Sequence, residues 1–482
     1  MKNKKTLKFN TLYNSLSDSE KLEFYEYLKS SLSPKLQVPK SVIENFKTGV
    51  ELSEIHFDKL TSQRLWNINS QLTKALEMFF ALKELNNDPE QIFRLAAIQM
   101  NKRNLNKMVQ KSYVKRINDL SNSNIHEKTF RKLSDTCMEY IHSLLTEDDK
   151  KKQAEVYELY NKFFSLSMIF ELIIMRFNNE VTSIFSKDSE NYFLNDFFKC
   201  IDFSKILELL KNNFPRYYPV IRLWHYFYEL YSMKFDIVQY NKVKNYLFEI
   251  MDQLSDELNT SSLNVLTDLL IIKREELGAD VDRELFEVFF KKESKGLTED
   301  FKLNKIGYNH FRDNIFIALK VGEIEWAEYF LNKYSETLPE NQKINDVNTG
   351  KAQICLSKGQ FKDAINFIGK INKSFYIHYS DYFRISIKSY FELAKYNECI
   401  SLAEKYKEYL KRNKNLPDSF VNGSKLFIKN VTHLSEYKIT SDKKHLNHFE
   451  LSKLKNQNLS NNWLLDKFNK LIKSNNEMKN MI

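Results

Sequence analysis

Glycine and proline are scarce along the whole chain, and this scarcity limits the folds that it can adopt. The 482 residues include nine glycines and seven prolines, whereas average usage would give roughly 34 and roughly 24. Glycine supplies the positive φ angles of tight hairpin turns, and proline interrupts helices. A large β-domain needs many such turns, so the composition predicts an all-α fold.

Local signals place several helices along the chain. Ser17 and Glu20 have the spacing of a capping box, in which a hydroxyl and a carboxylate each accept from a backbone N–H at the start of a helix. Asp88 followed by Pro89 is a second helix start, because proline suits the first turn. Between these points a long helix is expected over about residues 61–85. Its apolar residues recur at helical spacing: Leu65, Ile68, Leu72, Leu76 and Phe79.

The chain is too long for one compact core, so several packed units or an extended solenoid are expected. Short polar stretches such as 259–262 mark the expected joints between helices, and the periodicity pauses near 296–305. We expect four regions: an N-terminal helical region at 1–90, irregular helical hairpins at 91–300, repeats at 301–437 and C-terminal capping helices at 438–482.

Three segments of the C-terminal half repeat one pattern of small and apolar residues. Each has a small residue, an apolar residue two positions later and a second small residue three positions after that. The offsets between the units are 37 and 35 residues. The first small residue suits a tight turn between antiparallel helices, the second lets the helices approach, and the apolar residue fills the gap. The three sets are Gly322, Ile324 and Ala327; Gly359, Phe361 and Ala364; and Ala394, Tyr396 and Cys399.

This pattern resembles the tetratricopeptide repeat, whose period is about 34 residues. Pro339 and Pro417 follow the first and third units, where such repeats end. The resemblance implies tetratricopeptide-like hairpins over about 307–437, within an α-solenoid of helical hairpins. The glycine usual in the first helix of each repeat is replaced here by Ile315, Ala352 and Ile387.

The whole chain also resembles a widespread set of uncharacterised bacterial helical-repeat proteins of about the same length. This resemblance implies fold and length but no activity. It rests on residues 103–119, 283–290, 325–328 with 338–339, and 463–467.

In tetratricopeptide arrays the first helix of each repeat lines the concave face, so the resemblance implies that partners bind there. Six residues fall on that face in the register above, and because four are cationic we expect an acidic or C-terminal peptide ligand. The alternative is that these cations are ordinary solvated surface. Phe316 stands where the carboxylate clamp of chaperone-binding repeat proteins has Asn, so a chaperone tail is not implied. The six residues are Arg312, Phe316, Lys320, Gln353, Arg384 and Lys388.

A second candidate surface is a basic ridge in residues 91–118, a stretch without Asp or Glu. Cations recur every four residues, which places them on one face of a helix. The residues expected on the opposite, buried face are Leu105, Met108, Val109, Ile117 and Leu120. Such a ridge suits the phosphates of RNA or DNA. The alternative is a solvated face, or one that contacts acidic residues of a neighbouring helix. The ridge residues are Arg103, Lys107, Lys111 and Lys115.

The sequence contains no recognisable catalytic or metal-binding motif. Phosphate-binding glycine loops, Gly-x-Ser-x-Gly and His-Glu-x-x-His are all absent. His445 and His448 are three residues apart on an expected helix, but zinc needs a third or fourth ligand. His433 is the only other histidine nearby, and no cysteine joins it. We therefore expect exposed histidines, no bound metal and no cofactor.

The compartment is expected to be the cytoplasm. The four cysteines form no Cys-x-x-Cys pair, so free thiols in a reducing environment are expected. Residues 1–10 are basic, but no apolar stretch of signal-peptide length follows them. The longest apolar segment, 163–175, includes Ser and Glu and is too short to span a bilayer.

Together these features favour a non-catalytic protein–protein interaction scaffold of unknown pathway, because solenoids leave a long concave surface open. The alternative is an RNA- or DNA-associated helical-repeat protein that uses the basic ridge. The net charge of +10 is compatible with an acidic partner, but 63 acidic residues are mixed among the 73 basic ones. An enzyme is the third choice, because no cluster of carboxylates or histidines is evident.

Overall fold

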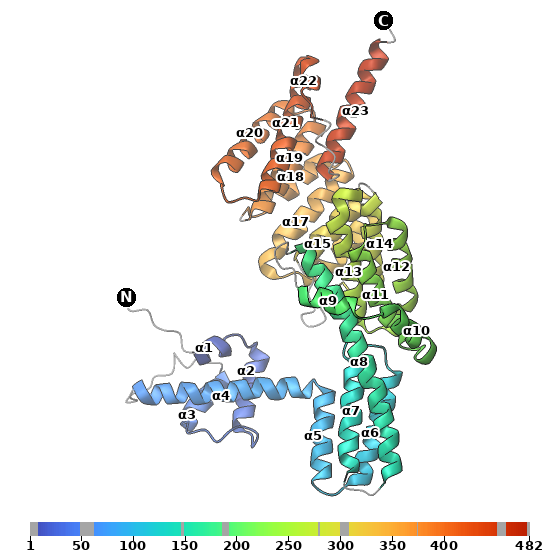
Figure 1. Cartoon of the computed structure of the whole chain (residues 1–482). Helices are drawn as coiled ribbons and strands as arrows, with labels where there is room; N and C mark the ends of the chain where they lie inside the picture. The colour runs from blue at the N-terminus through green and yellow to red at the C-terminus, as the bar shows by residue number, and fades with distance from the viewer. Residues whose placement is uncertain are drawn as a thin grey trace. The chain divides into compact units, whose positions relative to one another are not determined.

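The computed structural model describes residues 8–48, 62–145, 149–185, 192–277, 280–298, 308–373, 375–450 and 459–479. Within these ranges the regular structure is helical, apart from an isolated bridge between Ile125 and Leu254 (Figure 1). The predicted all-α fold is therefore confirmed. Among the described helices, none combines the length and the hydrophobicity that crossing a membrane requires.

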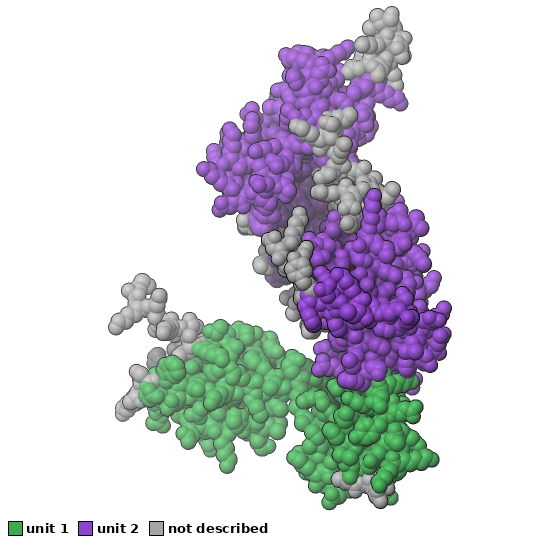
Figure 2. Space-filling view, viewed as in Figure 1, with its two compact units in different colours: residues 1–121, 132–162 green, residues 122–131, 163–482 purple. Residues whose placement is uncertain are grey.

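The chain divides into two compact units (Figure 2). Unit 1 comprises residues 1–121 and 132–162, and unit 2 comprises residues 122–131 and 163–482. Two helices, α7 (Thr129–Leu144) and α8 (Lys150–Phe185), are divided between the units, and α6 (Asn106–Asn122) belongs to unit 1 except for its last residue. The boundaries expected from the sequence at residues 90, 300 and 437 follow a different division and remain predictions.

The first four helices of unit 1 enclose an aromatic core. Phe9, Phe24 and Phe46 are buried, with ring centroids 5.5 to 6.3 Å apart. The predicted capping box opens the second helix, where the Ser17 side chain accepts from the N–H of Glu20 and the Glu20 carboxylate accepts from the N–H of Ser17. The helices are α1 (Lys8–Tyr13), α2 (Asp18–Lys29), α3 (Lys40–Asn45) and α4 (Ser62–Asn86), with a 3-10 turn, η1 (Phe46–Thr48), after α3.

The rest of unit 1 is built from α5 (Pro89–Asn101), α6 (Asn106–Asn122), α7 and the start of α8. As predicted, α5 starts at Pro89, and the Asp88 side chain caps it by accepting from two backbone N–H groups. Tyr113 of α6 is buried and stacks on Tyr140 of α7, with ring centroids 5.6 Å apart. This contact fixes which face of α6 is turned away from solvent.

Helices continue through the first part of unit 2, and one expected joint is wrong. Residues 259–262 lie inside α13, whereas the chain breaks earlier, at η2 (Met251–Gln253). Asn259 is polar because its side chain bonds to the preceding turn, not because it lies in a loop. From within α13 its amide donates to the carbonyl of Met251 at 3.0 Å. The helices are α9 (Tyr192–Lys199), α10 (Phe203–Asn213), α11 (Tyr218–Ser232), α12 (Ile237–Ile250), α13 (Asp256–Leu277) and α14 (Asp280–Ser294).

Three helical hairpins follow, in the segment predicted to hold the repeats (yellow-orange to orange in Figure 1). The two helices of each hairpin pack together, and the first helix of each hairpin also packs on the first helix of the next. The hairpins are α15 (Tyr308–Lys320) with α16 (Ile324–Tyr334), α17 (Glu340–Ser357) with α18 (Phe361–Gly369), and α19 (Tyr376–Glu392) with α20 (Tyr396–Arg412). A short η3 (Ser335–Thr337) follows α16, and the chain continues with α21 (Asp418–Thr440), α22 (Lys444–Asn447) and α23 (Leu459–Lys479).

The repeat register predicted from the sequence is confirmed at the turns and at the crossings. Gly322, Gly359 and Ala394 link the two helices of their hairpins with φ angles of 89°, 76° and 58°, the left-handed region that glycine adopts most readily. The second small residue of each set is fully buried, as a close helix crossing requires. These residues are Ala327, Ala364 and Cys399.

Gly350 provides a close approach that the sequence analysis did not identify. It lies on α17, and a Cβ atom at this position would be 2.7 Å from Leu331 Cδ1 and 3.1 Å from Ile315 Cδ1. Because both distances are shorter than ordinary van der Waals contact, this glycine allows α17 to pack tightly against the first hairpin. The usual repeat glycine is absent two residues later, at Ala352.

Candidate functional site

A groove of about 710 Å³ lies within unit 2. Its lining comes mainly from α15, α19 and α21, with single residues or pairs from α13, α14, α17 and α23. Apolar side chains such as Phe289, Ile317 and Phe420 alternate there with polar ones. All six residues predicted for the concave face line this one groove: Arg312, Phe316, Lys320, Gln353, Arg384 and Lys388.

Two of the four groove cations are held by carboxylates of the protein itself. Arg312 donates to both carboxylate oxygens of Asp381 on α19, with distances of 2.7 to 3.1 Å, and its guanidinium lies 4.3 Å from the Phe316 ring centroid. Lys320 forms an ion pair with Asp282 on α14, and both side chains are 5% exposed. These two cations therefore brace neighbouring helices.

The other two cations, Arg384 and Lys388, lie one turn apart on α19. Lys388 is 3% exposed, and burial, followed by the charge of Arg384, lowers the pKa of its amine to about 7. Arg384 donates to Ser424 Oγ at 3.4 Å, but its Nε is buried without an acceptor among the described residues. No described carboxylate forms an ion pair with either side chain.

The two carboxylates that influence Lys388 most are already engaged. Asp381 accepts from Arg312, and Glu392 accepts from Trp463 Nε1 and from Lys467 Nζ, each at 2.6 Å. From the sequence, the six residues of the concave face were expected to form either a binding face or ordinary solvated surface, and both alternatives imply open side chains. That assumption is wrong for three of the six residues. The structure buries Lys388, Gln353 and the side chain of Lys320 in the wall of the groove.

A buried carboxyl group beside the groove was missed by the sequence analysis. Asp346 of α17 is 5% exposed, and Asp346, Arg312, His378 and Asp381 line one small cavity. Burial raises the pKa of Asp346 to about 7, while the Arg312 charge opposes this rise. The sequence carries no local signal for this carboxyl, because its neighbours come from α15 and α19.

The basic ridge forms a separate site in unit 1. Lys107, Lys111 and Lys115 of α6 are exposed and line a hollow of about 460 Å³. Lys152 of α8 also lines it, and its amine donates to Gln110 Oε1 at 2.7 Å. No described carboxylate forms an ion pair with these four lysines. Acidic residues do neutralise two other cations of the stretch, through the pairs Arg94–Glu139 and Arg116–Glu90.

Two details of the predicted ridge are wrong. Arg103 lies before α6, in a turn where Asn104 has a φ of 58°, and it donates to the carbonyl and side chain of Gln99. On the expected buried face, Val109 and Ile117 are buried as predicted, but Leu105 and Met108 are 40% and 58% exposed. The turn shifts the start of the helix, so the face buried against α7 is set by Tyr113 and its neighbours.

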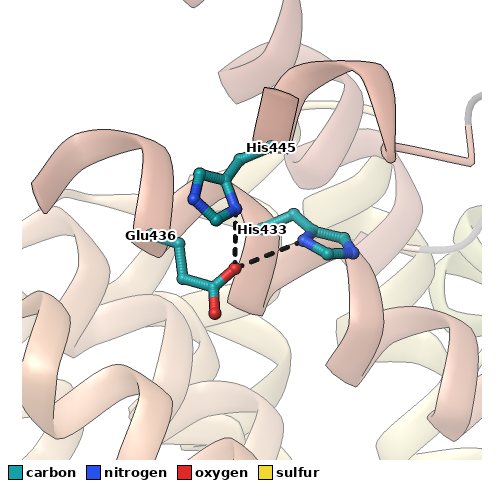
Figure 3. A group of neighbouring side chains, drawn as sticks. All are labelled: His433, Glu436 and His445. Carbon is teal, nitrogen blue, oxygen red and sulfur yellow. Dashed lines mark hydrogen bonds and ion pairs between the residues drawn. The ribbon is translucent and has the colours of Figure 1, made fainter. Parts of the chain in front are cut away.

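The histidines near the C-terminus converge on a carboxylate that the sequence analysis did not consider. His433 Nδ1 and His445 Nδ1 lie 3.3 Å and 2.9 Å from Glu436 Oε2 (Figure 3). The ring of His448 lies 5.6 Å from that of His433, between centroids. His448 is exposed as predicted, but the His445 side chain is 15% exposed, so the prediction of an exposed pair is wrong for His445.

The stacked hairpins, their left-handed turn residues and the groove along their first helices define a tetratricopeptide-like helical-repeat protein. Residues 329–461 match the family model described as the SusR N-terminal TPR domain. No curated protein and no solved structure matches the chain at a significant level. The similarity of the whole chain to a bacterial family of the same length therefore remains a prediction.

Proposed function

We propose that the protein is a non-catalytic interaction scaffold that binds an acidic segment of a partner protein in the groove of unit 2. The main support is Lys388, a buried cation for which the described residues provide no carboxylate partner. A similarity to repeat domains of the tetratricopeptide type over residues 329–461 agrees with a binding role.

Burial of an unpaired ammonium group costs free energy, since the low dielectric of the interior disfavours the charged form. A ligand carboxylate beside Lys388 would supply the missing charge and remove that cost. Arg384 offers a second donor one turn away, and its Nε lacks an acceptor in the described structure. One acidic group of a ligand can therefore be recognised by both side chains.

The remaining lining sets limits on the ligand. Arg312 and Lys320 are already paired with Asp381 and Asp282, so they contribute less free charge than the sequence analysis assumed. Phe289, Ile317 and Phe420 add apolar surface. A peptide with an acidic residue beside an apolar residue fits this lining better than a uniformly acidic chain does. A free C-terminal carboxylate would serve equally well as the acidic group.

Affinity capture from lysate over a salt series, with and without nuclease, tests the scaffold role. A protein partner bound in a largely desolvated groove stays bound after nuclease and at moderate salt. Arg384→Gln should weaken capture of that partner, whereas Lys407→Gln, at an exposed position of α20, should have no effect. Capture that disappears with nuclease, or that is insensitive to Arg384→Gln, would refute the proposal.

A second candidate function, binding to RNA or DNA, is favoured by the four lysines that share the hollow of unit 1 without an acidic partner in the described structure. Phosphate contacts by lysine release counterions, so such binding weakens steeply with salt. Changing Lys107, Lys111 and Lys115 together to Glu should abolish a mobility shift with RNA or duplex DNA at low salt. If the wild-type protein gives no shift under these conditions, this candidate fails.

A further inference from the structure

The most convergent group of side chains outside the groove is the histidine and glutamate cluster at the end of α21. His433 and Glu436 lie three residues apart, so they occupy neighbouring positions on one face of α21. His445 comes from α22. The chain turns back after α21 because Ser441 adopts a left-handed φ of 59°, and this turn lets His445 reach the carboxylate of Glu436.

Two of the three spacings between the polar atoms match those of ligands around one small cation. Zinc binds histidine nitrogen at about 2.0–2.1 Å and carboxylate oxygen at about 2.0–2.2 Å, so two such ligands at the tetrahedral angle lie about 3.3 Å apart. His433 Nδ1 and His445 Nδ1 are 3.3 Å and 2.9 Å from Glu436 Oε2. One suitable atom from each of the three residues lies within 4.8 Å of the other two.

We infer that His433, Glu436 and His445 form a binding site for a divalent transition-metal ion such as Zn²⁺. The expectation of no metal rested on an incomplete ligand set, and Glu436 supplies the ligand that was missing. The fourth position of a tetrahedral ion is open to water or to His448, whose ring lies next to that of His433. Two imidazoles and one carboxylate suit zinc and its neighbours in the first transition series better than they suit calcium or magnesium.

The protonation of the cluster is compatible with this chemistry. In the metal-free protein Glu436 Oε2 contacts Nδ1 of both histidines, as a hydrogen-bond partner of His433 and an ion-pair partner of His445, and ligation through Nδ1 requires each ring to carry a proton on Nε2 alone. Imidazole binds metal in its neutral form, so binding should weaken as pH falls and the histidines become protonated.

The ion would join α21 to the fold-back segment that carries α22. In the described structure this connection includes the contacts of His445 with Glu436 and the ion pair of Lys429 with Glu450, at 2.6 Å. A shared metal ion would hold His445 against α21 more firmly than the contact with Glu436 alone. Metal binding should therefore raise the melting temperature of the full-length protein, because an ion that binds the folded state alone stabilises it.

Titration of the full-length protein, first stripped with a chelator, with Zn²⁺ and Co²⁺ tests the site. Calorimetry should give one Zn²⁺ per chain, and Co²⁺ should give the visible absorption of a low-symmetry nitrogen–oxygen site. His445→Ala and Glu436→Gln should each lower the affinity for Zn²⁺ at least tenfold. Their circular dichroism spectra should match that of the wild type, since α22 has four residues and lies at the end of the array.

His126→Ala is the matched control. His126 also contacts a glutamate, Glu257, but no second histidine is among its described contacts, so the pair lacks a third ligand. This variant should bind Zn²⁺ as the wild type does. Absence of Zn²⁺ binding by the wild type would overturn the inference. Binding that is unchanged by both His445→Ala and Glu436→Gln would also overturn it, because the ion would then be held elsewhere.

Discussion

Arg312 of α15 and Asp381 of α19 are 69 positions apart in the sequence, yet their side chains form a bidentate ion pair across the first helix of the middle repeat. The Asp381 side chain is 10% exposed, so removal of its partner leaves a buried charge. We expect Arg312→Ala to lower the free energy of unfolding by about 2 kcal/mol, less than the cost of about 3–5 kcal/mol for breaking a fully buried pair, because the Arg312 side chain is 25% exposed. Chemical denaturation of the variant measures this loss.

A double-mutant cycle separates the pair from the individual side chains. Asp381→Ala should also be destabilising, and the variant with both changes should lose less stability than the two single losses combined. Strict additivity would show that the ion pair does not couple the two helices. The same result matters for binding studies, because Arg312→Ala perturbs the fold and is a poor probe of the groove.

The turn residue Ala394 is the least favourable of the three left-handed positions. An L-residue in this conformation costs about 1–2 kcal/mol, whereas glycine avoids that cost but loses up to about 1 kcal/mol more chain entropy on folding. Ala394→Gly should therefore raise the free energy of unfolding by about 0.5–1 kcal/mol. The reverse change at the equivalent turn, Gly359→Ala, should lower it by a similar amount. If both changes shift the melting temperature in the same direction, the account of the turns is wrong.

These turns also show why much of the fold could be predicted from the sequence. The conformations of Gly322 and Gly359 depend on residues within one hairpin, and so does the burial of Ala364. Helix starts such as Asp88 are equally local. Local signals gave a wrong helix boundary at residues 259–262. The Asn259 amide there donates to the carbonyl of Met251, in the turn that precedes the helix.

The candidate sites were less predictable, because their electrostatics depend on residues far apart in the sequence. The register placed Lys320 on the groove, but its partner Asp282 comes from α14, 38 positions earlier. Glu436 lies close to His433 in sequence, yet His445 reaches it only because Ser441 reverses the chain. The sequence pattern predicts which face carries the cations, but not which of these cations are paired with carboxylates.

Asp346 should make stability depend on pH. Its pKa is raised to about 7, first by burial, above the value of about 3.9 expected in the unfolded chain. The folded state therefore binds more protons between these values, and its stability falls as pH rises from about 4 to about 7. Asp346→Asn removes this titration, so the variant should gain about 2–4 kcal/mol relative to the wild type between pH 4 and pH 8.

Unfolding of both proteins at pH 4.5 and pH 8 tests this expectation. Asp363→Asn is the control, because Asp363 is exposed on α18 and its removal should leave the pH dependence unchanged. Parallel stability profiles for the wild type and Asp346→Asn would mean that the carboxyl group is ionised without penalty in the folded protein.

The proposed binding in the groove depends above all on Lys388. The variant Lys388→Met tests it, because methionine is similar to lysine in length but carries no charge. Burial lowers the pKa of this lysine to about 7, so the folded state resists protonation that the unfolded chain accepts up to about pH 10. Loss of the amine should therefore stabilise the unliganded protein at pH 7, by about 1–3 kcal/mol. The presence of a destabilising lysine at this position is explained if its charge binds a ligand.

The most direct measurement is a fluorescence-anisotropy titration of wild-type, Lys388→Met and Lys407→Met protein with a labelled peptide that contains acidic and apolar residues and ends in a free carboxylate. The account predicts binding by the wild type that weakens as pH rises above about 7, because Lys388 then loses its proton. It predicts the same affinity for Lys407→Met, and at least a tenfold loss, about 1.4 kcal/mol, for the more stable Lys388→Met. Equal affinity of Lys388→Met and wild type, or no binding of acidic peptides by the wild type, would contradict the account.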